Sequence, residues 1–298
     1  MHPTIICFGE TLFDILPDGA MPGGAPMNVA IHLAYNGHAP LVISRVGKDA
    51  FGKELTGFLE SKGLPTALIQ QDQTHQTGVV EANVSNKLHV TYTIVEPVAW
   101  DFISYDEQLA ESIRKSKVFI YGSLAARHKT TRETLMNYLA LAAGLKVFDV
   151  NLRPPHYTPE GVMQLLEQAD IVKMNHQELI EIMSWFGKNL EEKESMEYLL
   201  KRFNKQLLLV TRGENGASLI TRDGYAEHPG FQVTVEDTIG SGDAFLAMYL
   251  HRYLLGMPPS EALSYACAAG AYVATQRGAT PEVPEHFTHA LMKSSIYS

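Results

Sequence analysis

A glycine-rich stretch in the last quarter of the chain combines the features of an anion site and of an acid–base catalyst. Gly240, Ser241 and Gly242 directly precede an amphipathic segment that predicts a helix. The first turn of a helix carries unpaired N–H groups and a partial positive charge, which together attract an anion. Asp243 would lie beside that anion, where a carboxylate is most useful as the general base for an attacking hydroxyl group. The alternative is that Asp243 only stabilises the first turn of the helix.

A second glycine pair near the N-terminus predicts a site for a neutral polar ligand. Gly23 and Gly24 precede another expected helix and leave backbone donors free, and Asn28 in its first turn offers both a donor and an acceptor. Asp14 lies upstream in an otherwise apolar segment. Asp14, Gly24 and Asn28 could together bind neighbouring hydroxyl groups of a sugar. The alternative for Asp14 is a turn residue before Pro17.

Two well-known phosphate-binding loops do not fit these residues. A G-x-G-x-x-G dinucleotide motif that starts at Gly240 would need a glycine or alanine where Phe245 stands. The sequence also contains no G-x-x-x-x-G-K-[ST] motif. The stretch is therefore neither a convincing dinucleotide fingerprint nor a P-loop.

Composition and charge narrow the class of protein. The chain has 298 residues, of which 45% are hydrophobic and 19% charged, so it can bury a sizeable core. Its 33 acidic residues outnumber 24 basic ones, and the net charge of −9 argues against a nucleic-acid groove. Cys7 and Cys267 lie in apolar runs and are expected to be buried free thiols. No run approaches the ~18 apolar residues of a membrane span, and no leader is visible, which predicts a cytoplasmic protein without membrane partners.

The order of apolar segments predicts an α/β fold. From about residue 97 onward, short apolar runs alternate with amphipathic segments, which is typical of βαβ units and of a parallel sheet covered on both faces. Polar and apolar residues instead alternate along 88–94, which predicts a half-exposed antiparallel sheet. We expect its turn at Ser85-Asn86 and a loop over 17–24, where Gly and Pro are frequent.

The two glycine-rich stretches together resemble the signatures of the PfkB/ribokinase family of sugar and nucleoside kinases. Residues 23–30 read Gly-Gly-Ala-Pro-Met-Asn-Val-Ala, and residues 237–245 read Asp-Thr-Ile-Gly-Ser-Gly-Asp-Ala-Phe. Shorter motifs at 149–153, 173–178 and 210–216 follow in the family's order. The resemblance covers essentially the whole chain, and its specificity comes from the combination, since each intermediate motif is weak alone.

This resemblance implies a single kinase domain over residues 1–298. The implied fold class is α/β, with a ribokinase-like three-layer α/β/α core and a small β-sheet lid whose strands lie at about 11–16 and 76–97. Such a lid would cover the substrate and exclude water. Its exposed edge could pair with a second copy of the chain, which predicts a homodimer. The alternative for these strands is an ordinary surface hairpin.

The resemblance also implies ATP and Mg²⁺ as cofactors and a role for individual residues. Asp243 becomes the general base, and the N–H groups of Gly240, Ser241 and Gly242 become the anion hole for the transferred phosphoryl group. The residues implied on the sugar side are Asp14, Gly23, Gly24, Asn28 and Arg153, the last directed to the sugar or the phosphates. The residues implied on the side of ATP and Mg²⁺ are Lys173, Asn175, Glu178, Thr211, Gly213, Gly216, Cys267 and Gly270. For Arg153 and Glu178, the alternative is a pair of ordinary surface charges.

Members of this family often bind a monovalent cation beside the anion hole, and part of that pattern is present here. Asp237 and the Ile239 carbonyl match the family's positions, whereas Glu282 stands where the ribokinase type has a serine. A set of hard oxygen ligands would suit K⁺. The carbonyl groups that could complete the cage belong to Val273, Gln276 and Gly278.

The sequence favours a neutral sugar as the acceptor. Between Lys48 and Arg114 the only Lys or Arg residues are Lys53, Lys62 and Lys87, too few to hold a second phosphate. The Gly-Gly-Ala-Pro motif and the segment around Trp100 look most like bacterial fructokinases, which predicts phosphorylation of D-fructose at its 6-hydroxyl group. Trp100 would then stack on the sugar, or else serve as a core aromatic residue. Ribose, 2-keto-3-deoxygluconate, inosine or adenosine remain alternatives, as does a non-catalytic sugar sensor.

Overall fold

Two separate β-sheets organise the part of the chain that the computed structural model describes, which comprises residues 4–16, 19–86 and 89–288. Within these residues, the larger sheet has the strand order β13-β12-β11-β10-β9-β8-β1-β4-β5. Its strands are β1 (Ile5–Phe8), β4 (Pro40–Gly47), β5 (Ile69–Asp72), β8 (Val118–Gly122), β9 (Leu145–Asp149), β10 (Ile171–Asn175), β11 (Leu207–Thr211), β12 (Ala217–Thr221) and β13 (Tyr225–His228).

The strands of the larger sheet are parallel from β5 to β11, as the alternation of apolar segments predicts. The prediction of a parallel sheet is wrong at one edge, where β12 and β13 run antiparallel to their neighbours. The reason is the length of the connections. Only a short 3-10 turn, Gly213–Asn215, lies between β11 and β12, and a parallel crossover needs a dozen residues or more.

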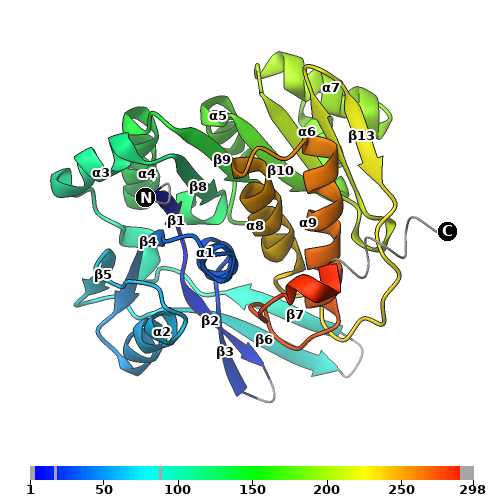
Figure 1. Cartoon of the computed structure of the whole chain (residues 1–298). Coiled ribbons are helices and arrows are strands. Elements are labelled where there is room, and N and C mark those ends of the chain that lie inside the picture. The colour runs from blue at the N-terminus through cyan, green and yellow to red at the C-terminus, as the bar shows by residue number, and fades with distance from the viewer. Residues whose placement is uncertain (1–3, 17–18, 87–88, 289–298) are drawn as a thin grey trace.

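Helices cover both faces of the larger sheet, so the core has three layers, and each face buries its own hydrophobic cluster. On one face α1, α8 and α9 lie side by side (Figure 1), with α8 packed against both of the others. The α-helices are α1 (Ala25–Tyr35), α2 (Ala50–Ser61), α3 (Ala110–Lys115), α4 (Lys129–Leu141), α5 (Pro159–Gln168), α6 (His176–Trp185), α7 (Glu192–Arg202), α8 (Ser241–Leu254) and α9 (Pro259–Ala274). The further 3-10 turns are Ala99–Phe102, Glu107–Leu109 and Leu124–Ala126.

The smaller sheet projects from the end of the core where β1 and α1 meet (Figure 1), and it confirms the expected separate sheet. Its strand order is β3-β2-β6-β7, with β2 parallel to β6 and the other pairs antiparallel. The strands are β2 (Leu12–Leu16), β3 (Gly19–Gly23), β6 (Gly78–Asn86) and β7 (His89–Ile94).

Two local predictions in this sheet are wrong. The expected loop over 17–24 contains β3, an edge strand in which Pro22 is tolerated because one side of the strand needs no N–H donor. The turn expected at Ser85-Asn86 is also misplaced, since β6 continues to Asn86 and pairs with His89 of β7. A local irregularity of register between Val84 and Asn86 lets the strand run on past the expected turn.

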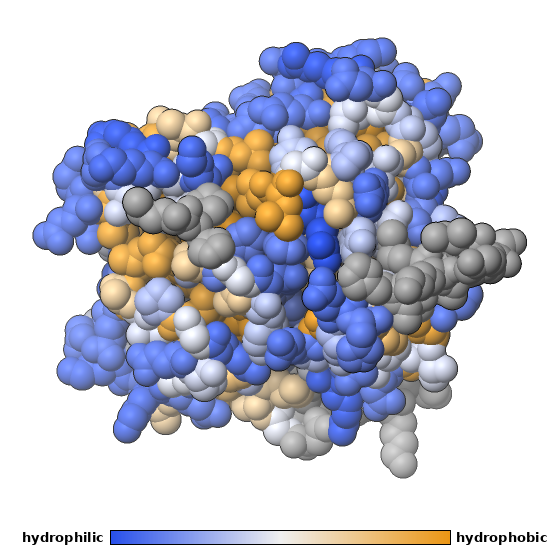
Figure 2. Space-filling view, in the orientation of Figure 1, coloured by the Kyte–Doolittle hydropathy of each residue, from blue (hydrophilic) through white to orange (hydrophobic). Residues whose placement is uncertain are grey.

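The surface and the thiols agree with the composition. Figure 2 shows hydrophilic residues over much of one face of the molecule, especially around α2 and α7. Cys7 and Cys267 are buried free cysteines, and burial raises the pKa of Cys267 to about 12, so this thiol stays protonated. None of the helices in the described ranges is long and apolar enough to cross a lipid bilayer.

Candidate active site

The N-terminus of α8 is shaped by close packing against a neighbouring loop. Gly240 precedes the helix with a φ of 78°, in the left-handed region that favours glycine. A side chain at Gly240 would collide with the backbone of Ala279. The backbone hydrogen bonds found among the described residues use the N–H groups of Ser241 and Asp243 but not that of Gly242. The first turn of α8 therefore presents a donor at the place where the sequence predicts an anion hole.

Asp243 joins the two glycine-rich stretches. Its Oδ2 accepts a 2.8 Å hydrogen bond from Asn28 Nδ2, across 215 residues of sequence. Desolvation raises the pKa of Asp243 to about 6, helped by the charge of Asp149 and opposed by Lys173 and by the Asn28 hydrogen bond. The carboxyl group is thus ionised at neutral pH but basic enough to accept a proton.

Lys173 supplies a positive charge below this helix end. Its Nζ lies 3.0 Å from both carboxylate oxygens of Asp149, and both side chains are buried. A Cβ placed on Gly242 would lie 3.0 Å from the same Nζ, so the ammonium group is adjacent to the α8 N-terminus. Burial lowers the pKa of Lys173, but the carboxylates of Asp149, Asp243 and Glu178 outweigh it and the net shift is upward. Lys173 therefore stays charged beside the N-terminus of α8.

Asp14 and Glu10 form a second group of carboxyls, near the stretch where the sequence predicts sugar binding. Desolvation raises the pKa of Asp14 to about 6, and the Arg153 charge opposes that shift. Desolvation also raises the pKa of Glu10 to about 7, with Arg153 lowering it and Asp243 raising it. Arg153 is exposed, and its positive charge lowers the pKa values of Glu10, Asp14 and Asp243. Sequence reasoning missed Glu10, whose position after β1 was the available signal.

Three buried polar atoms of this candidate site have no hydrogen-bond partner among the residues that the structure describes. They are Glu10 Oε2, Asn28 Oδ1 and Ser241 Oγ. Buried polar groups are nearly always satisfied in native proteins, so each of these atoms still has the capacity to bond to a water molecule or a ligand. Gly23 fits the same picture, because a Cβ there would lie 2.6 Å from Asp14 Oδ2. Gly24 has a φ of 119° and packs against the Glu10 carbonyl.

Glu178 is a buried structural anchor and not an ordinary surface charge. Its two carboxylate oxygens accept 2.8 Å hydrogen bonds from the N–H groups of Leu152 and Asn175, and Asn175 Oδ1 in turn accepts the Glu178 N–H. This capping box starts α6 and fixes the segment after β9. Each Glu178 oxygen therefore already accepts one backbone N–H group.

The residues expected on the nucleotide side divide into two groups. Thr211 ends β11 directly beside Asn175 of β10, so both lie at the same sheet edge. Gly213 has a φ of 60° and is exposed. The other three have packing roles in the structure: Gly216 in a tight turn against β13, Gly270 where α9 meets Ser241, and Cys267 in the hydrophobic core.

The residues expected around a monovalent cation are partly brought together. Asp237 Oδ1 accepts the Ile239 N–H at 3.0 Å, and Oδ2 accepts the Gly278 N–H at 3.3 Å. The Val273 carbonyl accepts the N–H of Gln276. Glu282 is exposed. No group of three or more His, Cys, Asp or Glu side chains in the described ranges could hold a metal, so a cage here would depend on carbonyl oxygens.

Trp100 lies in the hydrophobic core and is fully buried. The Arg127 guanidinium covers its ring at 3.9 Å and pairs with Asp101 through two hydrogen bonds of 2.7 and 2.8 Å. A Cβ on Gly78 would collide with its indole nitrogen. This placement favours the core role over stacking on a sugar.

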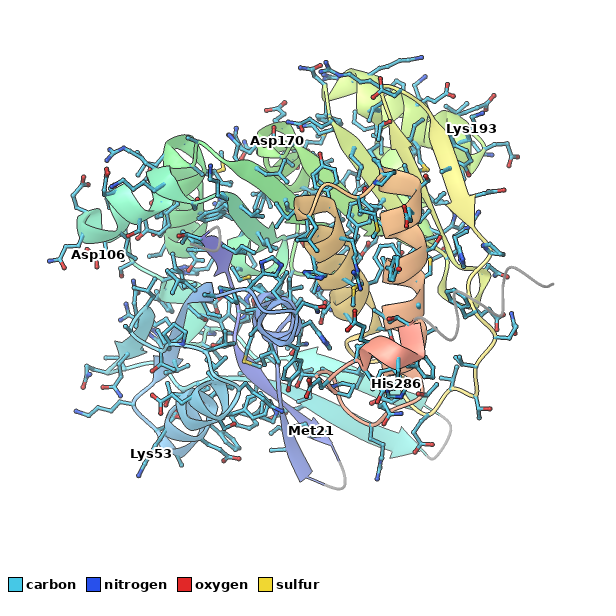
Figure 3. The ribbon with its side chains drawn as sticks, in the orientation of Figure 1. Met21, Lys53, Asp106, Asp170, Lys193 and His286 are labelled. Carbon is cyan, nitrogen blue, oxygen red and sulfur yellow. The ribbon has the colours of Figure 1, made fainter. Side chains whose placement is uncertain are left out.

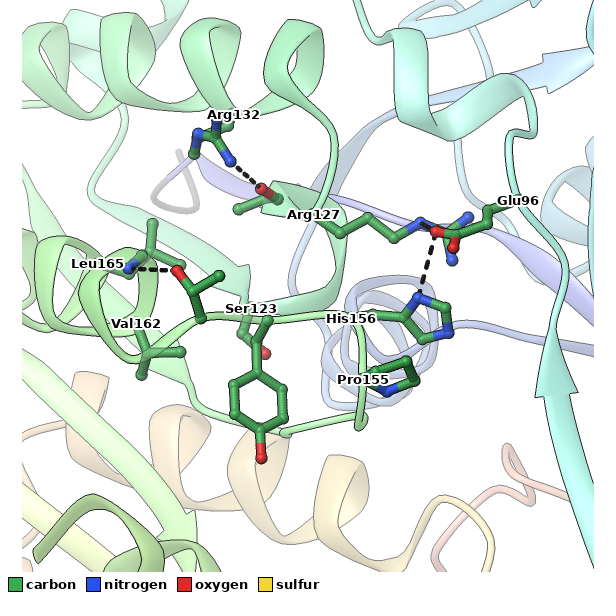
Figure 4. A pocket seen from close by; sticks show the side chains of 12 residues that line it. Glu96, Ser123, Arg127, Arg132, Pro155, His156, Val162 and Leu165 are labelled. Carbon is green, nitrogen blue, oxygen red and sulfur yellow. Dashed lines mark hydrogen bonds and ion pairs between the residues drawn. The ribbon is translucent and has the colours of Figure 1, made fainter. Parts of the chain in front are cut away.

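A cavity of about 220 Å³ lies next to this cluster (Figure 4). Glu96, which follows β7 of the smaller sheet, lies across it 3.3 Å from His156 and 3.7 Å from Arg127. His156 belongs to the segment that carries Arg153. The Glu96–His156 contact thus connects the smaller sheet to the segment that carries Arg153.

Comparison with known proteins agrees with the fold described above. The family model for pfkB family carbohydrate kinases matches residues 19–286. The chain belongs to the pfkB family. As a pfkB member it is an ATP-dependent carbohydrate kinase, and the ribokinase-like fold that the sequence implies is confirmed.

Individual pfkB relatives match over nearly the whole chain. It is 30% identical to probable fructokinase-2 of Arabidopsis thaliana over 94% of this chain and 92% of that protein. The structure of a fructokinase with bound ATP from Xylella fastidiosa superposes with a TM-score of 0.87 at 25% identity, covering 99% of this chain and 100% of that one. The fold also matches a fructokinase from Vibrio cholerae O395 bound to fructose, ADP and calcium, with a TM-score of 0.83 at 24% identity over 97% and 98% of the two chains.

Proposed function

We propose that this pfkB kinase transfers the terminal phosphoryl group of ATP to the 6-hydroxyl group of D-fructose. The observation that carries the proposal is the hydrogen bond between Asn28 and Asp243, which sets the general base at the junction of the sugar stretch and the anion hole. Fructose is favoured by the names of the relatives and by the few basic residues between positions 48 and 114. A cytoplasmic location and a homodimer through the smaller sheet stay predictions.

The proposed mechanism assigns a task to each part of the site. Asp243 accepts the proton of the attacking hydroxyl group while Asn28 holds its carboxylate in place. The Gly242 N–H and the Lys173 ammonium stabilise the charge that develops on the transferred group. The smaller sheet covers the sugar and keeps water from competing for the phosphoryl group.

The chain fits a magnesium–nucleotide complex through water rather than through direct ligands. Both Glu178 oxygens already accept backbone N–H groups, and Asn175 is engaged in the same capping box. Each carboxylate oxygen keeps a further lone pair for a water molecule. When bound, Mg²⁺ would supply positive charge that offsets the charge of the ATP phosphates. Asp237 and neighbouring carbonyls would hold K⁺ if the kinase uses it.

The proposed function is tested by ADP release from Mg-ATP against a panel of acceptors. The panel contains fructose, ribose, 2-keto-3-deoxygluconate, tagatose, glucose and inosine, each with and without K⁺. Fructose is expected to give the highest kcat/KM. Turnover with another acceptor would replace fructose in the proposal, and nucleoside turnover would favour a nucleoside kinase. If folded protein binds ATP but turns over none of these acceptors, the result would favour a sugar sensor.

Asp14→Asn separates sugar binding from chemistry. Asp14 lies against Gly23 and within the field of Arg153, so we place its carboxylate on the sugar hydroxyls and not on the phosphoryl group. Losing a charged hydrogen bond of about 1.5–3 kcal/mol is expected to raise the sugar KM by roughly 10- to 100-fold. The kcat and the KM for ATP should change much less. Steady-state kinetics with both substrates varied measures this, and a loss of kcat at unchanged sugar KM would remove Asp14 from the sugar site.

A further inference from the structure

One face of α1 makes three polar contacts with the elements of the site. Asn28 donates to Asp243, His32 Nε2 lies 3.0 Å from the carbonyl oxygen of Ala279, and Tyr35 OH donates to the carbonyl of Thr280 at 3.4 Å. Positions four and seven residues apart share one helix face. Helix α1, which carries Asn28, therefore also contacts the loop that follows α9.

That loop packs directly on the anion hole. The backbone of Ala279 occupies the space where a side chain on Gly240 would be, and the Gly278 N–H donates to Asp237 just before the hole. The smaller sheet touches the same loop, since a Cβ on Gly278 would lie 2.9 Å from Met21 Cε. Met21 is the central residue of the edge strand β3 and is labelled in Figure 3. The loop is thus in contact with α1, with the smaller sheet and with the start of α8.

His32 is suited to hold this loop in one position. Its side chain is buried, and desolvation lowers its pKa to about 4, so the ring is neutral at working pH. The Ala279 carbonyl can only accept a hydrogen bond, so Nε2 carries the proton and donates it. A stiff planar ring inside a packed helix leaves this donor little freedom to move.

We propose that His32 is a positioning residue for phosphoryl transfer. It fixes the Ala279 carbonyl against Gly240, and this contact keeps the N-terminus of α8 in the shape that binds the transferred phosphoryl group. The inference rests on the proposed function, because it takes the α8 N-terminus as the anion hole. A preorganised donor loses its advantage when it shifts by a fraction of an ångström, so losing the hydrogen bond should impair the chemical step.

The test compares three variants of the full-length protein. His32→Phe keeps the size and planarity of the ring but removes the donor, His32→Gln restores an N–H at a similar reach, and Tyr35→Phe removes the longer contact one turn away. We expect His32→Phe to lower kcat at least tenfold while the sugar KM stays within about twofold. His32→Gln should regain most of the lost kcat, and Tyr35→Phe should remain within about twofold of the wild type. Circular dichroism and the thermal midpoint establish that each variant is folded.

Several outcomes would overturn the proposal. They are an unchanged kcat in folded His32→Phe, an equal loss in His32→Gln and His32→Phe, or a rise in sugar KM without a fall in kcat. If the wild type phosphorylates no acceptor, the proposed function fails separately, and calorimetry decides the role of His32. A non-hydrolysable ATP analogue should then lose affinity for His32→Phe several-fold more than ADP does, and equal losses would reject the role.

Discussion

Asp243→Asn is expected to abolish nearly all turnover while leaving sugar binding largely intact. The amide can keep a hydrogen bond with Asn28 but cannot accept the proton of the hydroxyl group. General bases contribute roughly 10²–10⁴-fold to a rate, so kcat should fall by about that factor. ADP release measures the loss, and calorimetric titration with fructose measures the binding. A variant with near-wild-type turnover would show that the base is another group.

The same variant should be more stable than the wild type. The pKa of Asp243 is about 6 in the folded protein, above its ordinary value of 3.8, so ionising it costs more in the fold than in the unfolded chain. This cost appears as the pH rises from about 4 to 6 and is fully present above 6. Because the side chain is only half-buried, we estimate it at roughly 1–2 kcal/mol. Thermal unfolding at pH 8 should show a raised midpoint for Asp243→Asn. A lowered midpoint would contradict the claim that the ionised Asp243 carboxylate destabilises the fold.

The pH dependence of wild-type activity should follow the ionisation of Asp243. Below about pH 6 Asp243 becomes protonated, so kcat/KM is expected to fall about tenfold per pH unit. The pKa values of Asp14 and Glu10 are about 6 and about 7, so their protonation also changes the slope of the fall in kcat/KM on the acid limb of the pH profile. The limb should persist in Asp14→Asn, which separates the base from the sugar ligand.

Local patterns in the sequence were sufficient for most of the fold. A buried parallel strand is apolar throughout, and a helix that packs on the sheet is apolar on one face. Both patterns can be recognised in the sequence, so the alternating strands and helices could be predicted. β3 could not be found this way, because its stability comes from pairing with β2 and not from its own residues. The antiparallel edge at β12 follows from the short connection at 213–215, which the sequence did show.

Within the candidate site, the sequence pointed to residues in motifs and not to those defined by contacts. Asp243 and Asn28, which the structure brings into hydrogen-bond contact, were singled out because each lies beside a glycine-rich helix start. Glu10 and Asp149 are buried beside charged neighbours from other segments, and the position of Glu10 after β1 was its only signal within the sequence. Trp100 was a candidate sugar-binding residue, but an aromatic side chain can equally well stack on a sugar or pack in the core. Its contact with Arg127, which favours the core role, could not be predicted from the sequence.

Lys173→Met should impair both the chemistry and the stability of the fold. Removing the ammonium group takes away a charge that lowers the pKa of Asp243, so the acid limb of the pH profile should move above pH 6. It also leaves the buried Asp149 carboxylate unpaired, and breaking such a pair costs about 3–5 kcal/mol. We therefore expect a large fall in kcat together with a lower thermal midpoint, measured by ADP release over a pH series and by thermal unfolding.

The double variant Lys173→Met/Asp149→Asn separates these two effects. With both charges removed, no unpaired ion stays buried, so much of the lost stability should return. The loss of Asp149 also lowers the pKa of Asp243 again, which should move the acid limb back toward pH 6. The kcat should nevertheless stay low, because no cation then lies beside Gly242 to stabilise the transferred phosphoryl group. Recovery of kcat along with stability would mean that Lys173 serves only to neutralise Asp149.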